Sequence, residues 1–349
     1  MKNSIRLVAI LIALVFSGAS FYFYQFGNSP ISHAKATFDL YKGMSPVDVS
    51  EALEKVNLVT NARSFYWYGK FTGGWSGIKA AEYEIPVNAA PSEIFKILKS
   101  GIGIQRPLLV KEGDNIYQVA ETMQSAGIGT KEEVLKLLRS HELIRSLGLG
   151  NEGIHSLEGY LYPNTYFYDK REKPEFMIRK MVQMFLKNWS QEFEERAKTL
   201  SWPRKQVVTM ASIIEKETGA AEERPIISSV FHNRLIKKMK IQSDPTIIYG
   251  IWETYSGNLH KSDLLRPTPY NTYTVPALPV GPISNVHPDS IKAVLFPAET
   301  KYLYFVSRND GTHVFSHTYQ EHLNWVKQTQ LNAAAREGKS WRDLGKKKH

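Results

Sequence analysis

The chain has 349 residues, 42% of them hydrophobic and 22% charged, a globular composition that excludes disordered, collagen-like and coiled-coil proteins. It contains no cysteine, which also excludes disulfides, thiolate metal sites and cysteine nucleophiles. The 44 Lys and Arg residues outnumber the 34 Asp and Glu residues, and the resulting net charge of +10 suits an anionic partner such as nucleic acid, lipid headgroups or an acidic polymer.

The N-terminus carries a segment long enough to cross a bilayer. Residues 7–26 hold no charge, and a helix of about 20 residues spans about 30 Å of hydrocarbon. Because Lys2 and Arg6 precede it, the positive-inside rule predicts residues 1–6 in the cytoplasm and the rest of the chain outside. Small residues at 17–20 leave a cleaved signal peptide as the alternative, which the bulky residues after them disfavour. These residues are expected at the far membrane interface: Phe21, Tyr22, Phe23, Tyr24 and Phe26.

After a linker at residues 27–34, residues 35–155 are predicted to form repeated β-α units. A strand, a glycine and a helix recur at an offset of 70 residues: strand 37–41, Gly43 and a helix opened by Pro46, then strand 108–110, Gly113 and a helix containing Ile116. A strand at 82–85 and a helix at 92–101 lie between them. The turn, helix and following loop resemble LysM modules, which bind the glycan of peptidoglycan and chitin. A plain strand-Gly-helix scaffold is the alternative.

Residues 156–337 are predicted to form a helix-rich domain with a β-hairpin, so the expected fold class is α+β. Apolar periodicity predicts helices at 174–200, 203–219 and 223–239, and a loop-rich layer at 241–290. Asn309-Asp310-Gly311 predicts a hairpin turn between strands at 302–307 and 312–316. A terminal helix at 319–337 and a basic tail at 338–349 end the chain.

Two motifs of other chemistries are present only as strings. Residues 148–153 match a dinucleotide fingerprint, but a leucine-rich helix precedes them where a strand is required, so they predict a helix stop and a loop. His313 and His317 lie on or just after a predicted strand, where a spacing of four does not form a helical metal face. We therefore expect neither a cofactor nor a metal.

The remaining chemical signal is a carboxylate at the end of the helix at 203–219. Apolar residues from Val207 to Ile214 define the buried stripe of this helix, and Glu215 and Glu217 flank it, with Glu217 slightly closer. Lys216 points to the opposite side. A carboxyl group against an apolar wall has a raised pKa and suits a general acid. A solvated Glu-Lys-Glu helix end is the alternative, and composition alone favours it.

Five strings, in order along the chain, resemble the endolytic murein transglycosylase family (MltG, YceG-like). They are Ala-Ser-Ile-Ile-Glu-Lys-Glu-Thr (211–218), Val-Phe-His-Asn-Arg-Leu (230–235), Ile-Gln-Ser-Asp-Pro-Thr-Ile-Ile-Tyr-Gly (241–250), Pro-Tyr-Asn-Thr-Tyr (269–273) and Leu-Pro-Val-Gly-Pro-Ile (278–283). With the anchor and the aromatic run at 158–168, the similarity extends to about residue 330. The resemblance implies that the catalytic acid is the Glu of the Lys-Glu-Thr triplet, which is Glu217 and not Glu215.

The resemblance also implies a lyase that cleaves the MurNAc-GlcNAc β-1,4 bond within nascent peptidoglycan strands and forms 1,6-anhydro-MurNAc ends. One carboxyl group suffices for this reaction, because the sugar's own C6 hydroxyl attacks C1. The same Glu protonates the leaving oxygen and deprotonates that hydroxyl. The implied partners are glycan strands, the cytoplasmic membrane and peptidoglycan synthases, beside which the enzyme would end strand elongation. Nucleic acid is not an expected partner, because the predicted anchor places the basic chain outside the cytoplasm. The implied location is the periplasmic side of the bacterial inner membrane.

Four residues on the predicted loops are candidates for orienting the sugar, since polar side chains and aromatic faces suit carbohydrate: Gln242, Asp244, Asn271 and Tyr273. Hydrogen bonding within the loops is the alternative for each. If Asp244 served as a second carboxylate with Glu217, the chain would be a hydrolytic muramidase that leaves free reducing ends. A non-catalytic peptidoglycan-binding scaffold is the third interpretation.

Overall fold

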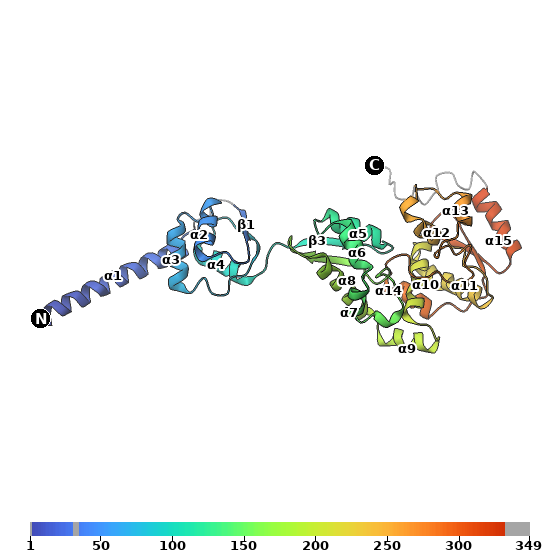
Figure 1. The fold of residues 1–349 in the computed structure, drawn as a ribbon, viewed down its shortest axis with the longest axis horizontal. Helices are drawn as coiled ribbons and strands as arrows, with labels where there is room; N and C mark the ends of the chain where they lie inside the picture. The colour runs from blue at the N-terminus through green and yellow to red at the C-terminus, as the bar shows by residue number, and fades with distance from the viewer. Residues whose placement is uncertain (1, 31–34, 332–349) are drawn as a thin grey trace. The chain divides into compact units, whose positions relative to one another are not determined.

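The computed structural model describes residues 2–30 and 35–331, and the chain divides into two compact units (Figure 1). The first unit contains the chain up to Arg106 together with Phe167–Arg171, and the second contains Pro107–Tyr166 and the chain from Glu172. This division lies near residue 106, whereas the sequence predicts a boundary between residues 155 and 156. The second copy of the repeat therefore belongs to the same unit as the helices that follow it.

The N-terminal helix α1 (Lys2–Asn28) contains a segment, Arg6–Asn28, that is long and apolar enough to cross a membrane. This confirms the helix predicted at residues 7–26, which runs on into the predicted linker at 27–34. Residues 31–34 lie outside the described part. Two side chains of the predicted aromatic belt contact other aromatic rings of the first unit. The ring centres of Phe23 and Phe71 are 5.1 Å apart, and those of Phe26 and Tyr68 are 5.9 Å apart.

The rest of the first unit consists of β1 (Ala36–Leu40), α2 (Pro46–Lys55), α3 (Ala62–Thr72), β2 (Ala81–Ile85) and α4 (Pro91–Ser100). β1 and β2 are antiparallel, with Phe38 opposite Tyr83. Ser45 opens α2 with a capping box that it forms with Asp48, as the Ser-Pro sequence predicts. α3 was not predicted. The core includes Phe38, Leu40, Val49, Leu53, Phe65, Tyr83, Ile94 and Leu98.

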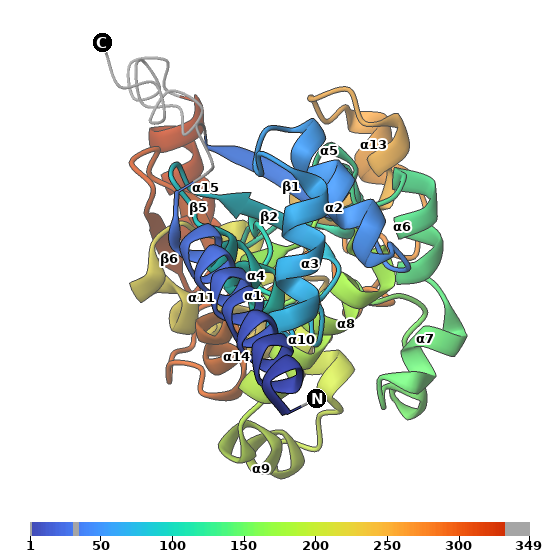
Figure 2. The ribbon, with the colours of Figure 1, turned by 90° about the vertical axis from the view of Figure 1, so that its left-hand side faces the viewer.

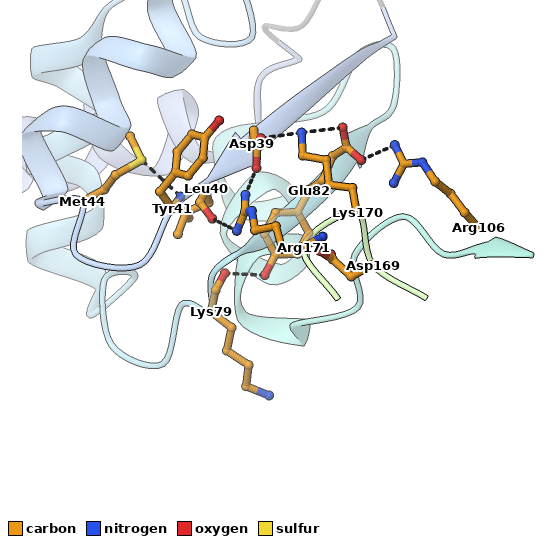
Figure 3. A network of polar contacts seen from close by, with 11 residues as sticks. Asp39, Leu40, Tyr41, Met44, Lys79, Glu82, Arg106, Asp169, Lys170 and Arg171 are labelled. Atoms are coloured by element: carbon orange, nitrogen blue, oxygen red, sulfur yellow. Dashed lines mark hydrogen bonds and ion pairs between the residues drawn. The ribbon is translucent and has the colours of Figure 1, made fainter. Parts of the chain in front are cut away.

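A cluster of ion pairs stabilises this small sheet around the facing residues Asp39 and Glu82 (Figure 3). Asp39 and Glu82 lie directly opposite each other on β1 and β2, where two like charges are destabilising. Lys170 bridges them, 2.5 Å from Asp39 and 3.0 Å from Glu82. Arg171 pairs with Asp39, and Arg106 lies 2.6 Å from Glu82 and holds the pKa of that carboxyl below its usual range. These three cations make the facing carboxylates compatible with the sheet.

The second unit opens with the second copy of the repeat, except for the first residue of β3 and the last two of β4, which belong to the first unit. The elements of this copy are β3 (Arg106–Val110), α5 (Ile116–Ser125), α6 (Lys131–Leu138), α7 (His141–Ser146), a 3-10 turn at Gly150–Glu152 and β4 (Asn164–Tyr168), which pairs with β3. Gly43 and Gly113 both adopt positive φ, +95° and +72°, and the matched Val49 and Val119 are both fully buried. The structural repeat is thus confirmed, as a strand, two packed helices and a strand. The string at 148–153 forms a turn, as predicted.

The centre of the second unit is α10 (Arg204–Glu217), in which every residue from Val207 to Ile214 is buried. It packs against α9 (Gln191–Thr199), α11 (Arg224–Ile236), α12 (Asp244–Gly250) and α14 (Pro288–Leu295). The prediction of a single helix at 174–200 is wrong. It is split into α8 (Pro174–Asn188) and α9, because Ser190 leaves the helical conformation and its side chain accepts the Phe193 N–H.

Short helices and a hairpin complete the second unit: the 3-10 turns Ala221–Glu223 and Trp252–Thr254, α13 (Lys261–Leu265), β5 (Tyr304–Ser307), β6 (His313–Ser316), α15 (Tyr319–Val326) and a π-helical turn at Lys327–Leu331. The hairpin is confirmed, with Asn309 and Gly311 at positive φ. The last part of the helix predicted at 319–337 and the tail at 338–349 lie outside the described residues. The mixed α+β class is confirmed.

A pair of glycine variants tests the packing of the aromatic run at 158–168 onto α10. Gly148 and Gly159 have similar φ values, +80° and +82°. A Cβ at Gly148 meets nothing within 4 Å, whereas at Gly159 it lies 2.7 Å from Pro282 and 2.8 Å from Val208. We expect Gly148→Ala to cost about 1 kcal/mol of unfolding free energy from its φ alone. Overpacking adds a further 1–3 kcal/mol or so in Gly159→Ala. Equal destabilisation in denaturant titrations would contradict this packing.

Candidate functional site

Glu217, the last residue of α10, lies at a cavity of about 370 Å³ in the second unit. The cavity is formed where the end of α10 meets α11, the segment before α12, the hairpin strand β5 and α15. Its wall combines charged, polar and aromatic side chains: Glu217, Arg234, Ile241, Gln242, Asp244, Tyr273, Tyr304, Phe305, Tyr319 and His322. Such a wall can contact both the hydroxyls and the ring faces of a sugar.

The two glutamates at the end of α10 have different roles, which the helical pattern alone leaves nearly undecided. Glu215 is a structural residue: its carboxylate accepts hydrogen bonds from the Ser290 hydroxyl at 2.7 Å and the His287 N–H at 3.0 Å, and it pairs with Arg224 at 3.5 Å. Glu217 instead accepts a hydrogen bond from the Ser243 hydroxyl at 2.5 Å. Neither is the solvated helix end of the alternative interpretation.

The environment of Glu217 favours its protonated form near neutral pH. The pKa of its carboxyl is raised to about 7, mainly by burial and also by the negative charge of Asp244, whereas the Ser243 hydrogen bond and the positive charge of Arg234 lower this pKa. By accessible surface the side chain is only half-buried, because the carboxyl faces the cavity. The group can therefore reach a ligand and exist in both protonation states around neutrality, as acid-base catalysis requires.

Arg234 is the cation of this cavity, and its charge is directed mainly at the backbone. Its guanidinium donates to the carbonyls of Leu303 at 2.6 Å and Ile241 at 2.7 Å, and lies 5.3 Å from the ring centre of Tyr304. Arg234 thus fixes the segment before α12 and β5 around the site. It was not predicted as a site residue, although it belongs to the string at 230–235.

The structure brings three of the four predicted sugar-binding residues to the cavity. Gln242, Asp244 and Tyr273 line it, and the Tyr273 hydroxyl donates to Asp244 at 2.7 Å. Asn271 is fully buried and is not among the lining residues. Its amide nitrogen donates to the carbonyls of Asp263, Leu264 and Arg266. This pattern matches the alternative interpretation of Asn271, a residue that hydrogen-bonds within the loop.

Sequence reasoning also missed Ser243, which lies behind Glu217, and several lining residues, among them His322. Ser243 is 2% exposed and holds the Glu217 carboxyl, and its place between Gln242 and Asp244 could have indicated it. His322 on α15 stacks on Tyr304 at 5.3 Å, and its buried Nδ1 has no hydrogen-bond partner among the residues that the structure describes. No motif surrounds His322, so only the fold of the hairpin and α15 brings it to the site.

Neither a second cavity nor the histidines of the hairpin offers an alternative active site in the second unit. A larger hollow of about 770 Å³ is mainly apolar, and its one carboxylate, Glu152, is paired with Arg204 at 2.5 Å. Among the described residues, no group of three or more His, Cys, Asp or Glu side chains could hold a metal ion. His313, considered above as a ligand, is instead bound to Glu223 at 2.7 Å.

Comparison with known proteins identifies the family of this chain. A model of the YceG-like family matches residues 38–328. The chain belongs to the YceG-like family. It is 32% identical over 304 residues to a protein of Bacillus subtilis named endolytic murein transglycosylase, covering 83% of this chain and 84% of the relative.

Two further members extend the comparison. An endolytic murein transglycosylase of Streptococcus pneumoniae is 26% identical over 351 aligned residues, which cover 90% of this chain and 63% of the relative. The chain therefore spans less than two thirds of the pneumococcal protein. The crystal structure of a YceG-like protein from Listeria monocytogenes matches with a TM-score of 0.59 at 32% identity, covering 83% of this chain and 98% of that chain.

The hydrogen bond from Ser243 to Glu217 can be tested through the titration of the Glu217 carboxyl. Because the hydroxyl stabilises the ionised form, Ser243→Ala should raise the pKa of Glu217 above about 7. The carboxyl carbon of Glu217, assigned by its loss in Glu217→Gln, can be followed by NMR as pH is varied.

Ser290→Ala is the matched control for this measurement, since Ser290 donates to Glu215 in the same way. It should lower the stability of the fold and leave the titration of Glu217 unchanged. An unchanged Glu217 titration in Ser243→Ala, or an equal shift in both variants, would contradict the assigned contact.

Proposed function

We propose that this chain is a membrane-anchored lytic transglycosylase that cuts peptidoglycan within the glycan strand, with Glu217 as its acid and base. The observation that carries the proposal is the Glu217 carboxyl, which faces a polar and aromatic cavity with its pKa raised to about 7. The names of the Bacillus and pneumococcal relatives support the reaction and the substrate. The family resemblance supports our proposal that the cleaved bond is the MurNAc-GlcNAc β-1,4 bond.

The proposed reaction uses one carboxyl group twice. Protonated Glu217 gives its proton to the glycosidic oxygen while the bond from that oxygen to C1 of MurNAc breaks. The resulting carboxylate takes the proton of the C6 hydroxyl, whose oxygen bonds to C1 and forms the 1,6-anhydro ring. The proton balance closes, and no water is consumed. A carboxyl with a pKa near the ambient pH suits both half-reactions.

In this proposal the Ser243 hydroxyl orients the Glu217 carboxyl, and the other lining residues position the sugar. Gln242 and Tyr273 are proposed to contact the glycan, with Tyr273 oriented by Asp244. We propose that Asn271 acts indirectly, through the loop that it holds. If Asp244 instead served as a general base for water, the enzyme would be a muramidase.

The anchor and the repeat set the proposed cellular context. We propose that α1 crosses the cytoplasmic membrane once, with Lys2 and Arg6 on the cytoplasmic side and the chain that follows α1 outside it. LysM-like binding of glycan by the strand-helix-helix-strand units would hold the substrate strand. Acting on nascent strands near the membrane, the enzyme would terminate their elongation alongside the peptidoglycan synthases.

Mass spectrometry of glycan strands incubated with the purified chain tests the reaction. We expect new ends that are lighter by one water than hydrolysis products. Their rate of formation should fall as pH rises above about 7, because the first step needs protonated Glu217. Glu217→Gln should reduce cleavage by at least about a hundredfold, the lower end of typical general acid-base contributions.

Glu222→Gln is the matched control, since Glu222 is an exposed carboxylate on the turn that follows α10. It should cleave at the wild-type rate. Products with free reducing ends, abolished by Asp244→Asn, would establish the muramidase instead. Strand binding without cleavage by the folded wild-type chain would favour the scaffold.

A further inference from the structure

The side chains of α3 in the first unit have three different environments. Phe65 and Gly69 are buried in the core of the unit. Ser64 and Tyr68 contact α1, through the Tyr22 hydroxyl at 3.3 Å and the Phe26 ring at 5.9 Å. The remaining face is exposed and carries two aromatic and two basic side chains at helical spacing: Arg63, Trp67, Lys70 and Phe71.

The contact between α1 and α3 is close, so it fixes the height of α3 along α1. A Cβ on Gly27 would lie 2.4 Å from the Tyr68 ring, so the glycine allows the two helices to approach. Phe71 lies 5.1 Å from Phe23, ring centre to ring centre. Figure 2, which looks onto the first unit from the side of α1, shows α3 and α4 beside this helix.

The length of α1 places these contacts at the edge of the membrane. If the hydrocarbon begins at Leu7, about 20 residues at about 1.5 Å each bring its outer boundary to Phe26. Phe23 lies three residues earlier, about 5 Å on the membrane side of that boundary. Phe71, which contacts Phe23, is therefore at the level of the boundary between acyl chains and headgroups.

The exposed face of α3 has the composition of an interfacial surface. Phe71 is 68% exposed and Trp67 is 40% exposed, and the two rings stack at 5.6 Å. Lys70 lies over the Trp67 ring, with its ammonium 4.8 Å from the ring centre. Aromatic rings at the headgroup level, beside cations that reach the phosphates, are typical of protein surfaces at the membrane interface.

We propose that the face of α3 formed by Arg63, Trp67, Lys70 and Phe71 is seated in the outer headgroup layer of the bilayer that α1 spans. Trp67 and Phe71 lie at the acyl boundary, and Arg63 and Lys70 bind lipid phosphates. The predicted aromatic belt at the end of α1 then continues onto α3, so the part of the first unit that follows α1 rests on the membrane surface. This inference depends on the proposed membrane anchor.

The absence of cysteine from the chain allows a clean test by site-directed spin labelling. Single cysteines replace Phe71 or Trp67 on α3, Val15 in α1, or Lys42, which is exposed after β1. The full-length chain is reconstituted into vesicles of phosphatidylglycerol and phosphatidylcholine. Collisions of the nitroxide with oxygen, which concentrates in lipid, and with a water-soluble nickel chelate are then measured by power saturation.

We expect the labels at Phe71→Cys and Trp67→Cys to lose collisions with the nickel chelate several-fold relative to Lys42→Cys, while Val15→Cys is more protected still. Nickel access at both α3 positions equal to that at Lys42→Cys, with Val15→Cys protected, would overturn the interfacial seat and leave the anchor standing. A water-accessible label at Val15→Cys would overturn the anchor itself. Because Phe71 and Trp67 are both exposed, either substitution should leave the fold intact.

Discussion

The carboxyl group of Glu217 lies at the end of the central helix of the second unit, partly removed from water. It has no direct ion pair with a cation among the described residues, so it is not held in its ionised form. α10 supplies the apolar wall, since every residue from Val207 to Ile214 is buried. The guanidinium of Arg234, which lines the cavity, is hydrogen-bonded to backbone carbonyls and leaves Glu217 with a neutral hydroxyl as its partner. Had Arg234 formed a direct ion pair with Glu217, the pKa would fall and the acid would be lost at neutral pH.

This arrangement has a cost in stability whose pH dependence follows from linkage. A carboxyl whose pKa rises from 4.5 in the unfolded chain to about 7 in the fold binds more protons when folded between those values. Its contribution is therefore most favourable below about pH 4.5 and is lost as pH rises through 7. Glu82 behaves in the opposite way, because Arg106 lowers its pKa, so its contribution is present above 4.5 and is lost on acidification. As pH rises, the contribution of Glu217 to the stability of its unit therefore falls, while that of Glu82 to the stability of the first unit increases.

The sequence predicted features set by local pattern and missed those set by distant partners. The glycine-linked repeat and the Asn-Asp-Gly hairpin follow from periodicity and turn chemistry, and both are confirmed. The break between α8 and α9 was missed because the apolar pattern continues across Ser190. α3 was missed because its aromatics serve three environments and so show no single stripe. The helical pattern favoured Glu217 over Glu215 only slightly, since the partners that distinguish them, Ser243 and Ser290, lie far along the chain.

The geometry around Asp244 bears on why one carboxyl group can be enough in the proposed reaction. A hydrolase needs a second carboxylate that is free to activate water on the other side of the sugar ring. Asp244 is exposed, and one of its oxygens accepts a hydrogen bond from the Tyr273 hydroxyl at 2.7 Å. This contact orients the Tyr273 side chain and occupies the Asp244 oxygen. When the nucleophile is the C6 hydroxyl of the substrate itself, no activated water is required. The structure then has to hold only the sugar and one proton-transferring group, and in the proposed reaction that group is Glu217.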